Sequence, residues 1–535
     1  MVSEKDFNKL LELSKDHIEL MNTIYRLKTF DETEIDKIYK DIKIKMIDTK
    51  LYTPESFCMI ISDASKFNNR YLKSYLSLFK KIIQEYHIKT IHRISAILNY
   101  FVYKECGIIL DFDNAFYLKD YESQNISINI HEENTIYKAI MEDDLKMFIL
   151  FTEIDGFDVN HAEEFSNFYP EPLEYSYLEL CCYHGAVNCF KLLRTKYNQE
   201  ITYQCLMFSF LSGVPDIVNE CLKVQKPLYQ CMEYSIISHN IDFISYLMNE
   251  YELTIDPEDC CKHNNLHAFL VYFDQTNDIQ NCLVSSPLFH LPSLCEYFIS
   301  QCDNINENEA CETTALCNAA YSGCKEITEL FISHGAKVDV RDCDNLIPLH
   351  YAAKTNSKEN VEVLILHNSD VNSKTYFNEW TPIHYAAITN NMEIVELLIS
   401  NGADVTAKDV NGNTVLHHAS EHNSIEAAEV LISHGAFVDE KNMSGQTSLF
   451  FTAIWNDVEM TEFLLKHGAD INAKDNDNKT PLIFAIENGC EYTAKYLILH
   501  YADVKAKDKS GKTTFDYANE LELTEIVDLL ISHGA

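Results

Sequence analysis

Glycine is scarce in this chain, with 14 residues among 535. Phosphate-binding loops and nucleophile elbows need glycines at fixed spacings. Neither motif occurs in the sequence, and neither does a metalloprotease helix or a complete calcium loop. We therefore predict no catalytic residues and no cofactor, and we expect that the protein is not an enzyme.

Long apolar runs are also lacking, because no stretch reaches the roughly 18 residues that a membrane-spanning helix needs. The start of the chain, MVSEKDFNKL, contains no apolar region of the kind found in a secretory signal. We therefore predict an intracellular, cytoplasmic protein without a membrane partner.

Basic side chains are in deficit, since 43 Lys and Arg face 82 Asp and Glu, a net charge of −39. Residues 1–100 hold 17 basic and 14 acidic side chains, a balance of +3, and subtraction from the totals leaves −42 for the rest. An acidic surface repels phosphate backbones and attracts basic proteins. We predict basic or mixed-charge protein partners and no nucleic acid.

Two alternatives to this interpretation of the charge stay open. The first is that the acidity only keeps the chain soluble. The second is that nucleic acid binds one mildly basic stretch, which consists of Lys80, Lys81, Lys89, His92 and Arg93.

A marker recurs every 33 residues in the second half of the chain, with a single step of 34. Its copies begin at His334, His367, Asn401, His434, His467, His500 and His533. A second marker keeps the same step: IPLHYAA from Ile347, TPIHYAA from Thr381, TVLHHAS from Thr414, TSLFFTA from Thr447, TPLIFAI from Thr480 and TTFDYAN from Thr513. This period and signature resemble those of the ankyrin repeat.

Each position of the repeat has a physical role. The threonines that begin the second marker suit helix N-caps, and Pro348, Pro382 and Pro481 suit the first helical position. Small residues such as Ala386-Ala387 let a second helix pack closely, and Gly402 suits a helix end. The stretch DVNGN from Asp409 predicts a hairpin turn. One such unit cannot bury its own apolar face, so neighbouring copies must stack. The recurring His350, His384 and His417 are expected to hydrogen-bond between repeats.

The middle of the chain shows a weaker form of the same pattern. The position that Asn390 holds between two helices has counterparts at Gly185, Gly213, His239, Asn264 and His290, at steps of 28, 26, 25 and 26. An earlier copy is centred on Asp143. These steps are short by about one hairpin, so we predict degenerate ankyrin-like helix pairs. The combination resembles the large protist families of ankyrin-repeat proteins.

The fold class that follows is mostly α. We predict a helical N-terminal domain at 1–130 that caps the solenoid, degenerate ankyrin-like helix pairs at 131–309, and regular ankyrin repeats at 310–535. The regular repeats connect by short β-hairpins and end in a polar C-terminal cap. The role of residues 1–130 and the oligomeric state are not readable from the sequence.

The chain also holds 18 cysteines, of which 15 lie between Cys181 and Cys343. None forms a C-x-x-C pair, the usual zinc spacing. The pairs Cys181-Cys182 and Cys260-Cys261 align with Ala386-Ala387, so we interpret them as small buried residues. We predict no metal site.

The ankyrin resemblance implies a non-enzymatic scaffold that binds partner proteins on the concave face and the hairpin tips of the solenoid. The alternative is a substrate-recognition adaptor of a larger complex such as a ubiquitin ligase, in which residues 1–130 dock onto the complex.

One hairpin tip departs from the repeat pattern. A single extra residue between Lys374 and Thr381 accounts for the 34-residue step, and the loop reads YFNEW. Its aromatic residues Tyr376, Phe377 and Trp380 are either binding anchors or a cover for a neighbouring repeat. Trp455, at the exposed end of a first helix, has the same two interpretations. The predicted partner-binding residues are Tyr376, Phe377, Trp380, Trp455, Glu421, His422, Asp409 and Asn411.

Overall fold

The structure is a computed structural model, and it divides into two compact units, Met1–Cys302 and Asp303–Ala535. These are the N-terminal and C-terminal units below. The residues that the structure describes are 4–89, 91, 93–111, 116–164, 168–170, 174–306, 314–453 and 458–535.

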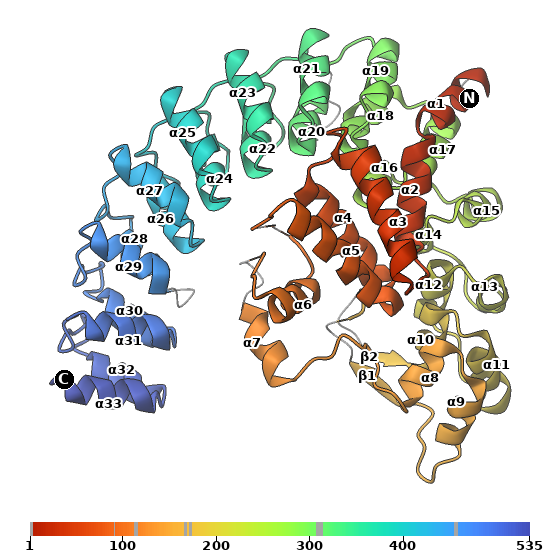
Figure 1. The fold of residues 1–535 in the computed structure, drawn as a ribbon, viewed down its shortest axis with the longest axis horizontal. Coiled ribbons are helices and arrows are strands. Elements are labelled where there is room, and N and C mark those ends of the chain that lie inside the picture. The colour runs from red at the N-terminus through yellow and green to blue at the C-terminus, as the bar shows by residue number, and fades with distance from the viewer. Residues whose placement is uncertain are drawn as a thin grey trace. The chain divides into compact units, whose positions relative to one another are not determined.

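The C-terminal unit is a row of antiparallel helix pairs in which each pair packs on the next (Figure 1). The first and second helices of successive pairs are α20 (Ala315–Ser322) and α21 (Lys325–Ser333), α22 (Pro348–Lys354) and α23 (Lys358–Leu366), α24 (Pro382–Ile388) and α25 (Met392–Ser400), α26 (Val415–Glu421) and α27 (Ile425–Ser433), α28 (Ser448–Thr452) and α29 (Val458–Lys466), α30 (Pro481–Glu487) and α31 (Glu491–Leu499), and α32 (Thr514–Glu520) and α33 (Thr524–Ser532).

The first helices begin where the repeat pattern predicts. Five of them follow the threonine N-caps of the second marker, and α22, α24 and α30 begin at the predicted prolines. The backbone N–H groups of Thr381 and Thr414 donate to Nδ1 of His384 and His417 at 3.2 and 3.1 Å. Ala386 and Ala387 are fully buried. Burying the leucines and isoleucines around them stabilises the row by roughly 1.5–3 kcal/mol per side chain.

The prediction that the signature histidines link neighbouring repeats is confirmed for two of the three. Nε2 of His350 lies 2.9 Å from the carbonyl oxygen of Ser373, and Nε2 of His417 lies 3.1 Å from that of Gln446. His384 makes no such bond, and its Nε2 has no hydrogen-bond partner among the described residues.

The tips between helix pairs form a hydrogen-bonded row of turns. Most turns close by a bond from residue i to residue i+4, as between the Asp409 N–H and the Asn413 carbonyl at 2.9 Å. From the second tip onward, each tip also donates one backbone N–H to the preceding tip. These bonds run from Tyr376 to Asp344, Val410 to Asn378, Met443 to Asn411, Asn476 to Ser444 and Lys509 to Asp477, at 2.8–3.0 Å.

Strand pairing is sparse, so the predicted β-hairpins are mostly turns. In the described part of the C-terminal unit, the only bridges join Lys408 to Thr414 and Lys507 to Thr513. In the N-terminal unit, β1 (Ala162–Glu164) pairs antiparallel with β2 (Glu174–Ser176).

The N-terminal unit contains a group of helices formed by the start of the chain and a row of shortened helix pairs. The start of the chain forms α1 (Glu4–Leu13), α2 (Lys15–Tyr25), α3 (Glu32–Ile42), the π-helical turn η1 (Lys43–Ile47), α4 (Pro54–Phe67), the 3-10 turn η2 (Asn69–Tyr71), α5 (Leu72–Glu85), α6 (Ala96–Cys106) and α7 (Phe116–Ser123). The shortened pairs comprise α8 (Ile136–Glu142) and α9 (Leu145–Thr152), α10 (Tyr177–His184) and α11 (Val187–Lys196), α12 (Tyr203–Ser212) and α13 (Pro215–Leu222), α14 (Tyr229–Ile237) and α15 (Ile241–Tyr251), α16 (Pro257–Lys262) and α17 (Leu266–Thr276), and α18 (Ile279–Ser285), η4 (Ser286–Phe289) and α19 (Pro292–Gln301).

The position aligned on Asn390 has the same backbone conformation in both units. Its φ is positive at Asp143, Gly185, Gly213, His239, Asn264 and His290, with values from 52° to 72°, and it is 53° at Asn390. A left-handed residue at this point ends the first helix and starts the second. The alignment of the shortened pairs with the regular ones therefore has a structural basis.

The N-terminal helices, which the sequence predicts as a cap on the solenoid, pack lengthwise against the shortened pairs. Arg26 donates to the carbonyl of Ser238 at 3.2 Å, and His290 Nδ1 lies 2.9 Å from the carbonyl oxygen of Leu51. The Tyr25 ring stacks on His239, and α1 contacts α17 and α19 (Figure 1). Residues 1–130 and 131–302 therefore share one compact unit.

The cysteines are mostly small buried residues, as their alignment predicts. Cys181, Cys182 and Cys260 are fully buried, and burial raises the pKa of each thiol. Cys261 is partly buried, and Cys343 is exposed at a hairpin tip.

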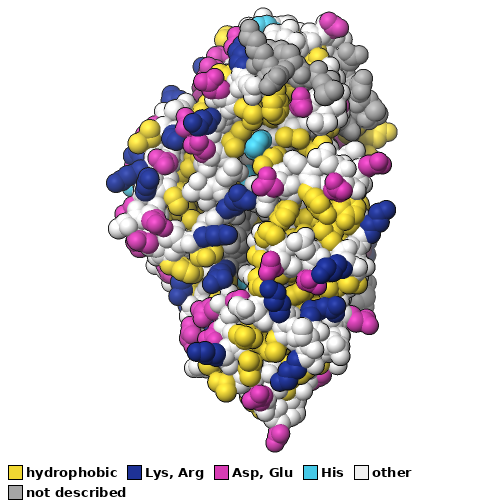
Figure 2. Space-filling model, turned by 90° about the vertical axis from the view of Figure 1, so that its right-hand side faces the viewer, with side chains coloured by type: hydrophobic (Ala, Val, Ile, Leu, Met, Phe, Trp, Pro, Cys, Tyr) yellow, Lys and Arg dark blue, Asp and Glu magenta, His cyan; other side chains and the backbone are white. Residues whose placement is uncertain are grey.

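One face of the N-terminal unit mixes charges of both signs. Figure 2 shows Lys and Arg side chains interspersed with Asp and Glu, with hydrophobic patches between them. In the described part of the chain, no helix combines the length and the apolar character needed to cross a bilayer.

Candidate functional site

Exposed apolar side chains occupy three consecutive tips of the C-terminal unit. Tyr376 is 72% exposed, Phe377 68%, Val410 44% and Met443 73%. The tip-to-tip hydrogen bonds place these residues on adjacent turns. Tyr376, Phe377, Val410 and Met443 together are called the tip strip.

The inserted residue shapes the first of these tips. The backbone N–H of Thr375 donates to the carbonyl of Trp380 at 2.9 Å, so this turn closes one residue later than the others. The Trp380 N–H in turn donates to Oγ1 of Thr375 at 2.9 Å. The longer turn exposes Tyr376 and Phe377, whose rings meet edge to face at 5.1 Å.

Trp380 belongs to a different environment from its two aromatic neighbours. Its ring is partly buried against the neighbouring helices, 5.2 Å from the Tyr385 ring and 4.8 Å from the His418 ring. The structure therefore separates the three aromatic residues of the loop. Tyr376 and Phe377 point to solvent, while Trp380 covers the junction between two repeats.

Asp409 corrects an expectation, because its side chain is buried rather than displayed at a tip. One carboxylate oxygen accepts the backbone N–H groups of Asn411 and Asn413 at 2.8 and 2.7 Å, and the other lies 3.0 Å from Nε2 of His418. Turn residues of this type often hydrogen-bond their own backbone. The carboxylate therefore holds the turn and has little surface to offer a partner.

Several predicted residues converge on His418, a residue that was not predicted from the sequence. Nε2 faces Asp409, and Nδ1 lies 3.6 Å from the carboxylate of Glu421. Burial lowers the pKa of His418, but the two carboxylates outweigh burial and the net pKa is raised. Burial raises the pKa of Asp409, but hydrogen bonds from His418 and Asn413 outweigh it and hold the pKa at about 2.

Three other predicted binding residues, Glu421, His422 and Asn411, are at least partly exposed. The nearby His418 side chain lowers the pKa of Glu421. Nδ1 of His422 lies 3.0 Å from the carbonyl oxygen of His418. Asn411 is exposed, and its carbonyl accepts the N–H of Met443. Trp455 lies outside the described residues.

Charged side chains beside the tip strip are paired locally. Lys374 contacts Glu379 at 2.7 Å, and Lys408 contacts Glu440 at 2.6 Å. Such exposed pairs add about 0–1 kcal/mol to stability. Their main effect is to reduce the positive charge available beside the strip.

The basic stretch near residue 80 is also paired with acids. Lys80 contacts Glu105 at 2.6 Å, and Lys81 contacts Asp36 at 2.8 Å. With Lys73, these lysines line a surface hollow of about 440 Å³ that also contains Glu32 and Glu105. His92 lies outside the described residues.

Val410 and Met443 were missed as candidates, although a sequence signal exists. They share the second position of the turn with Tyr376, where later repeats carry the polar Asn476 and Lys509. His418 also carries a signal, since the same position holds tyrosine or phenylalanine in the neighbouring repeats. Among the described residues, one group has the composition of a metal site: Glu233, Asp259 and His263.

Comparison with protein families gives two matches. A family described as "Ankyrin repeats (3 copies)" matches residues 284–375, 367–442 and 450–535. A family described as "Domain of unknown function (DUF3447)" matches residues 197–272, which span shortened pairs from α12 to α17. No curated protein matches the chain.

Proposed function

Since the chain is an ankyrin-repeat protein, we propose that its regular repeats bind a partner protein through the tip strip. Ankyrin repeats indicate a protein–protein interaction module, and such proteins are generally not enzymes. The observation that carries the proposal is the run of exposed apolar side chains over three adjacent tips.

The tip strip has the properties of a binding surface. Apolar patches that stay exposed on a folded protein often mark interaction sites, and aromatic residues are favoured as anchors. Backbone hydrogen bonds join the tips to one another. A surface that is already ordered loses little conformational entropy when a partner binds.

The partner suited to this surface combines apolar and basic groups. Its apolar side chains would cover Tyr376, Phe377 and Met443, while its basic groups would meet the acidic remainder of the chain, whose overall net charge is −39. Opposite charge speeds encounter at low ionic strength. The proposed mechanism is surface complementarity, and the proposed role is that of a scaffold.

The adaptor alternative assigns the N-terminal helices to a larger complex such as a ubiquitin ligase. One face of these helices already packs on the shortened pairs through contacts such as Arg26–Ser238 and His290–Leu51. Only their remaining surface is open to such a complex. Co-purification of a multisubunit complex with the full chain would favour the adaptor.

The test uses the full-length chain as bait for cell extract. In the first variant, Tyr376, Phe377, Val410 and Met443 are all changed to Ser. The control variant changes Leu366, Phe437 and Tyr501 to Ser, which are 78%, 67% and 89% exposed in the same unit. Circular dichroism and thermal unfolding show whether both variants stay folded.

We expect that some proteins are retained by the unaltered chain and by the control variant but are lost from the tip variant. Equal retention by all three baits would contradict it. A further bait with Trp380→Ala separates the tip strip from the Trp380–His418 junction, because that change leaves Tyr376 and Phe377 in place.

A further inference from the structure

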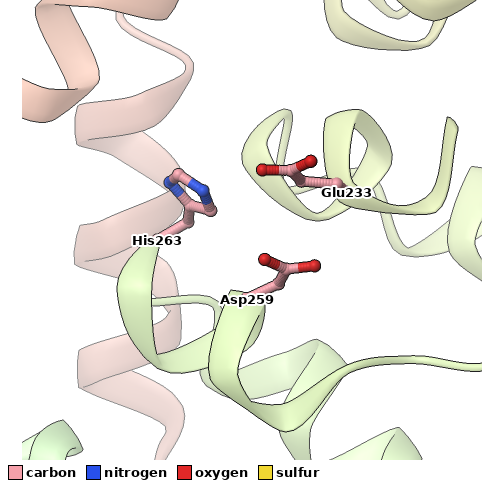
Figure 3. A group of neighbouring side chains, drawn as sticks. All are labelled: Glu233, Asp259 and His263. Atoms are coloured by element: carbon pink, nitrogen blue, oxygen red, sulfur yellow. The ribbon is translucent and has the colours of Figure 1, made fainter. Parts of the chain in front are cut away.

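Three side chains of the N-terminal unit converge on one point between two shortened repeats. Glu233 lies on α14, Asp259 lies on α16, and His263 directly follows α16 (Figure 3). One carboxylate oxygen from each acid and one ring nitrogen of His263 all lie within 4.8 Å of one another. The side chains point into a common space (Figure 3).

Local geometry explains why two of these groups face the same way. Asp259 and His263 are four residues apart, and the His263 N–H donates to the Asp259 carbonyl at 3.1 Å. Residues at this spacing lie one above the other on a helix. Glu233 comes from the first helix of the preceding pair, which packs against α16.

The surroundings of His263 give a second, independent reason to expect a ligand at this point. Its side chain is 2% exposed, and neither ring nitrogen has a hydrogen-bond partner among the described residues. Buried polar atoms without partners are rare, because leaving them unbonded costs free energy. Its neighbour in the same unit, His239, differs: Nδ1 lies 2.9 Å from Asn22, and Nε2 lies 2.9 Å from the His263 carbonyl oxygen.

The carboxylates are under-compensated as well. Among the described residues, the cation that pairs with this group is Lys262, whose largely exposed side chain lies 3.4 Å from Glu233. The nearby Lys66 pairs with Asp63 at 2.9 Å.

We propose that Glu233, Asp259 and His263 bind one divalent transition-metal ion of the zinc class. An imidazole nitrogen with two carboxylate oxygens suits Zn²⁺ and its neighbours, whereas Mg²⁺ and Ca²⁺ prefer oxygen ligands alone. Metal–ligand bonds of about 2.0–2.2 Å require only a small closing of the group. Three protein ligands leave a coordination position for water.

The bound ion would join α14 to α16 directly beneath the N-terminal helices. The Phe67 ring at the end of α4 meets the His263 ring edge to face at 5.5 Å. A ligand that binds only the folded state stabilises it. The metal would therefore stabilise the junction at which shortened repeats and N-terminal helices meet.

Zinc binding to the full chain tests the proposal. Equilibrium dialysis against Zn²⁺ and metal analysis would compare the unaltered protein with Glu233→Gln, Asp259→Asn and His263→Gln. Glu258→Gln is the matched control, since this exposed acid lies next to Asp259 on the same helix. Co²⁺ absorption provides a second readout, because thiolate coordination gives an intense charge-transfer band that nitrogen and oxygen ligands lack.

We expect one zinc ion per chain in the unaltered protein and the control, with a higher Tm in the presence of Zn²⁺. Each ligand variant should weaken binding at least about tenfold, since even outer-shell changes cost that much. Failure of the unaltered protein to retain zinc, equal retention by the ligand variants, or a thiolate band would overturn the proposal. If His263→Gln does not fold, the partly exposed Glu233 and Asp259 variants decide.

Discussion

The shortened and the regular repeats share a helix pair but differ in what the left-handed residue between the helices contacts. In the C-terminal unit, the Asn390 side chain accepts the N–H of Ala427 in the next repeat at 3.1 Å. In the N-terminal unit, His239 bonds both the next repeat and Asn22 of α2. The same position thus serves stacking alone in one unit, and stacking plus attachment of the N-terminal helices in the other.

The two kinds of repeat also differ in their tips. The regular repeats keep a turn that hydrogen-bonds to its neighbour, and three of these turns carry the tip strip. The shortened repeats follow one another at a closer spacing in the sequence, and the difference is about the length of one such turn. The shortened repeats thus hold the N-terminal helices through contacts such as His239 with Asn22, whereas the regular repeats carry the hydrogen-bonded row of turns.

The largest expected effect comes from Tyr52, where the N-terminal helices meet the shortened repeats. Tyr52 is buried, and its ring stacks on His290 at 3.9 Å. Tyr52→Ala should lower the free energy of unfolding by about 3–5 kcal/mol, as for other buried aromatic residues. Denaturant unfolding measures the loss, and hydrogen exchange should place it in α2–α5 and α18–α19. Tyr229→Ala, at a side chain that is largely exposed, should change stability little.

A second prediction concerns the close packing of the regular repeats. Ala387 is fully buried, and its counterpart in a shortened repeat is Cys182. Ala387→Leu should cost about 1–3 kcal/mol by overpacking, while Ala387→Cys should be tolerated much better. Thermal unfolding of the two variants checks this, and equal losses would show that the two positions are not equivalent.

The third prediction separates tip-to-tip contact from backbone conformation. Gly445 has a φ of 76°, and an added Cβ would lie 2.7 Å from the backbone nitrogen of Asn476. Gly435 has a φ of 97° with open space around it. Both changes to Ala incur the roughly 1–2 kcal/mol cost of a left-handed residue. Gly445→Ala should lose more in denaturant unfolding, and an equal loss would argue against close packing of the tips.

A smaller effect is expected from pH through His418. Because its pKa is raised above the ordinary value of 6.5, the pairs with Asp409 and Glu421 stabilise the fold fully below pH 6.5. This contribution is lost as the pH rises through the raised pKa. In a neighbouring repeat, Tyr351 donates to Asp342 at 2.5 Å, so His418→Tyr should keep the bond without the titration. Relative to His418→Tyr, the unaltered protein should therefore lose stability as the pH rises from 6 to 9. Unfolding free energies measured for both proteins over this range check this, and a constant difference between them would contradict it.

Much of this architecture could be predicted from sequence because repeats obey local rules. The helix pairs, the threonine and proline starts and the left-handed positions all follow from patterns within about 33 residues. The packing of the N-terminal helices could not be predicted, because Arg26 meets Ser238 and Tyr52 meets His290 across more than 200 residues. The burial of Asp409 and the role of His418 were missed because both depend on the position of a side chain nine residues away.

The smallest expected effect on stability is at the tip strip, and its effect on binding should be the largest. Changing Tyr376, Phe377, Val410 and Met443 to Ser should alter stability by only about 0.5 kcal/mol per site, as for other surface substitutions. The most direct measurement is hydrogen exchange of the full chain with and without a protein that it captures. Our account predicts protection at 375–380, 409–413 and 442–446, and none in the tip variant. Protection confined to the N-terminal unit would contradict it.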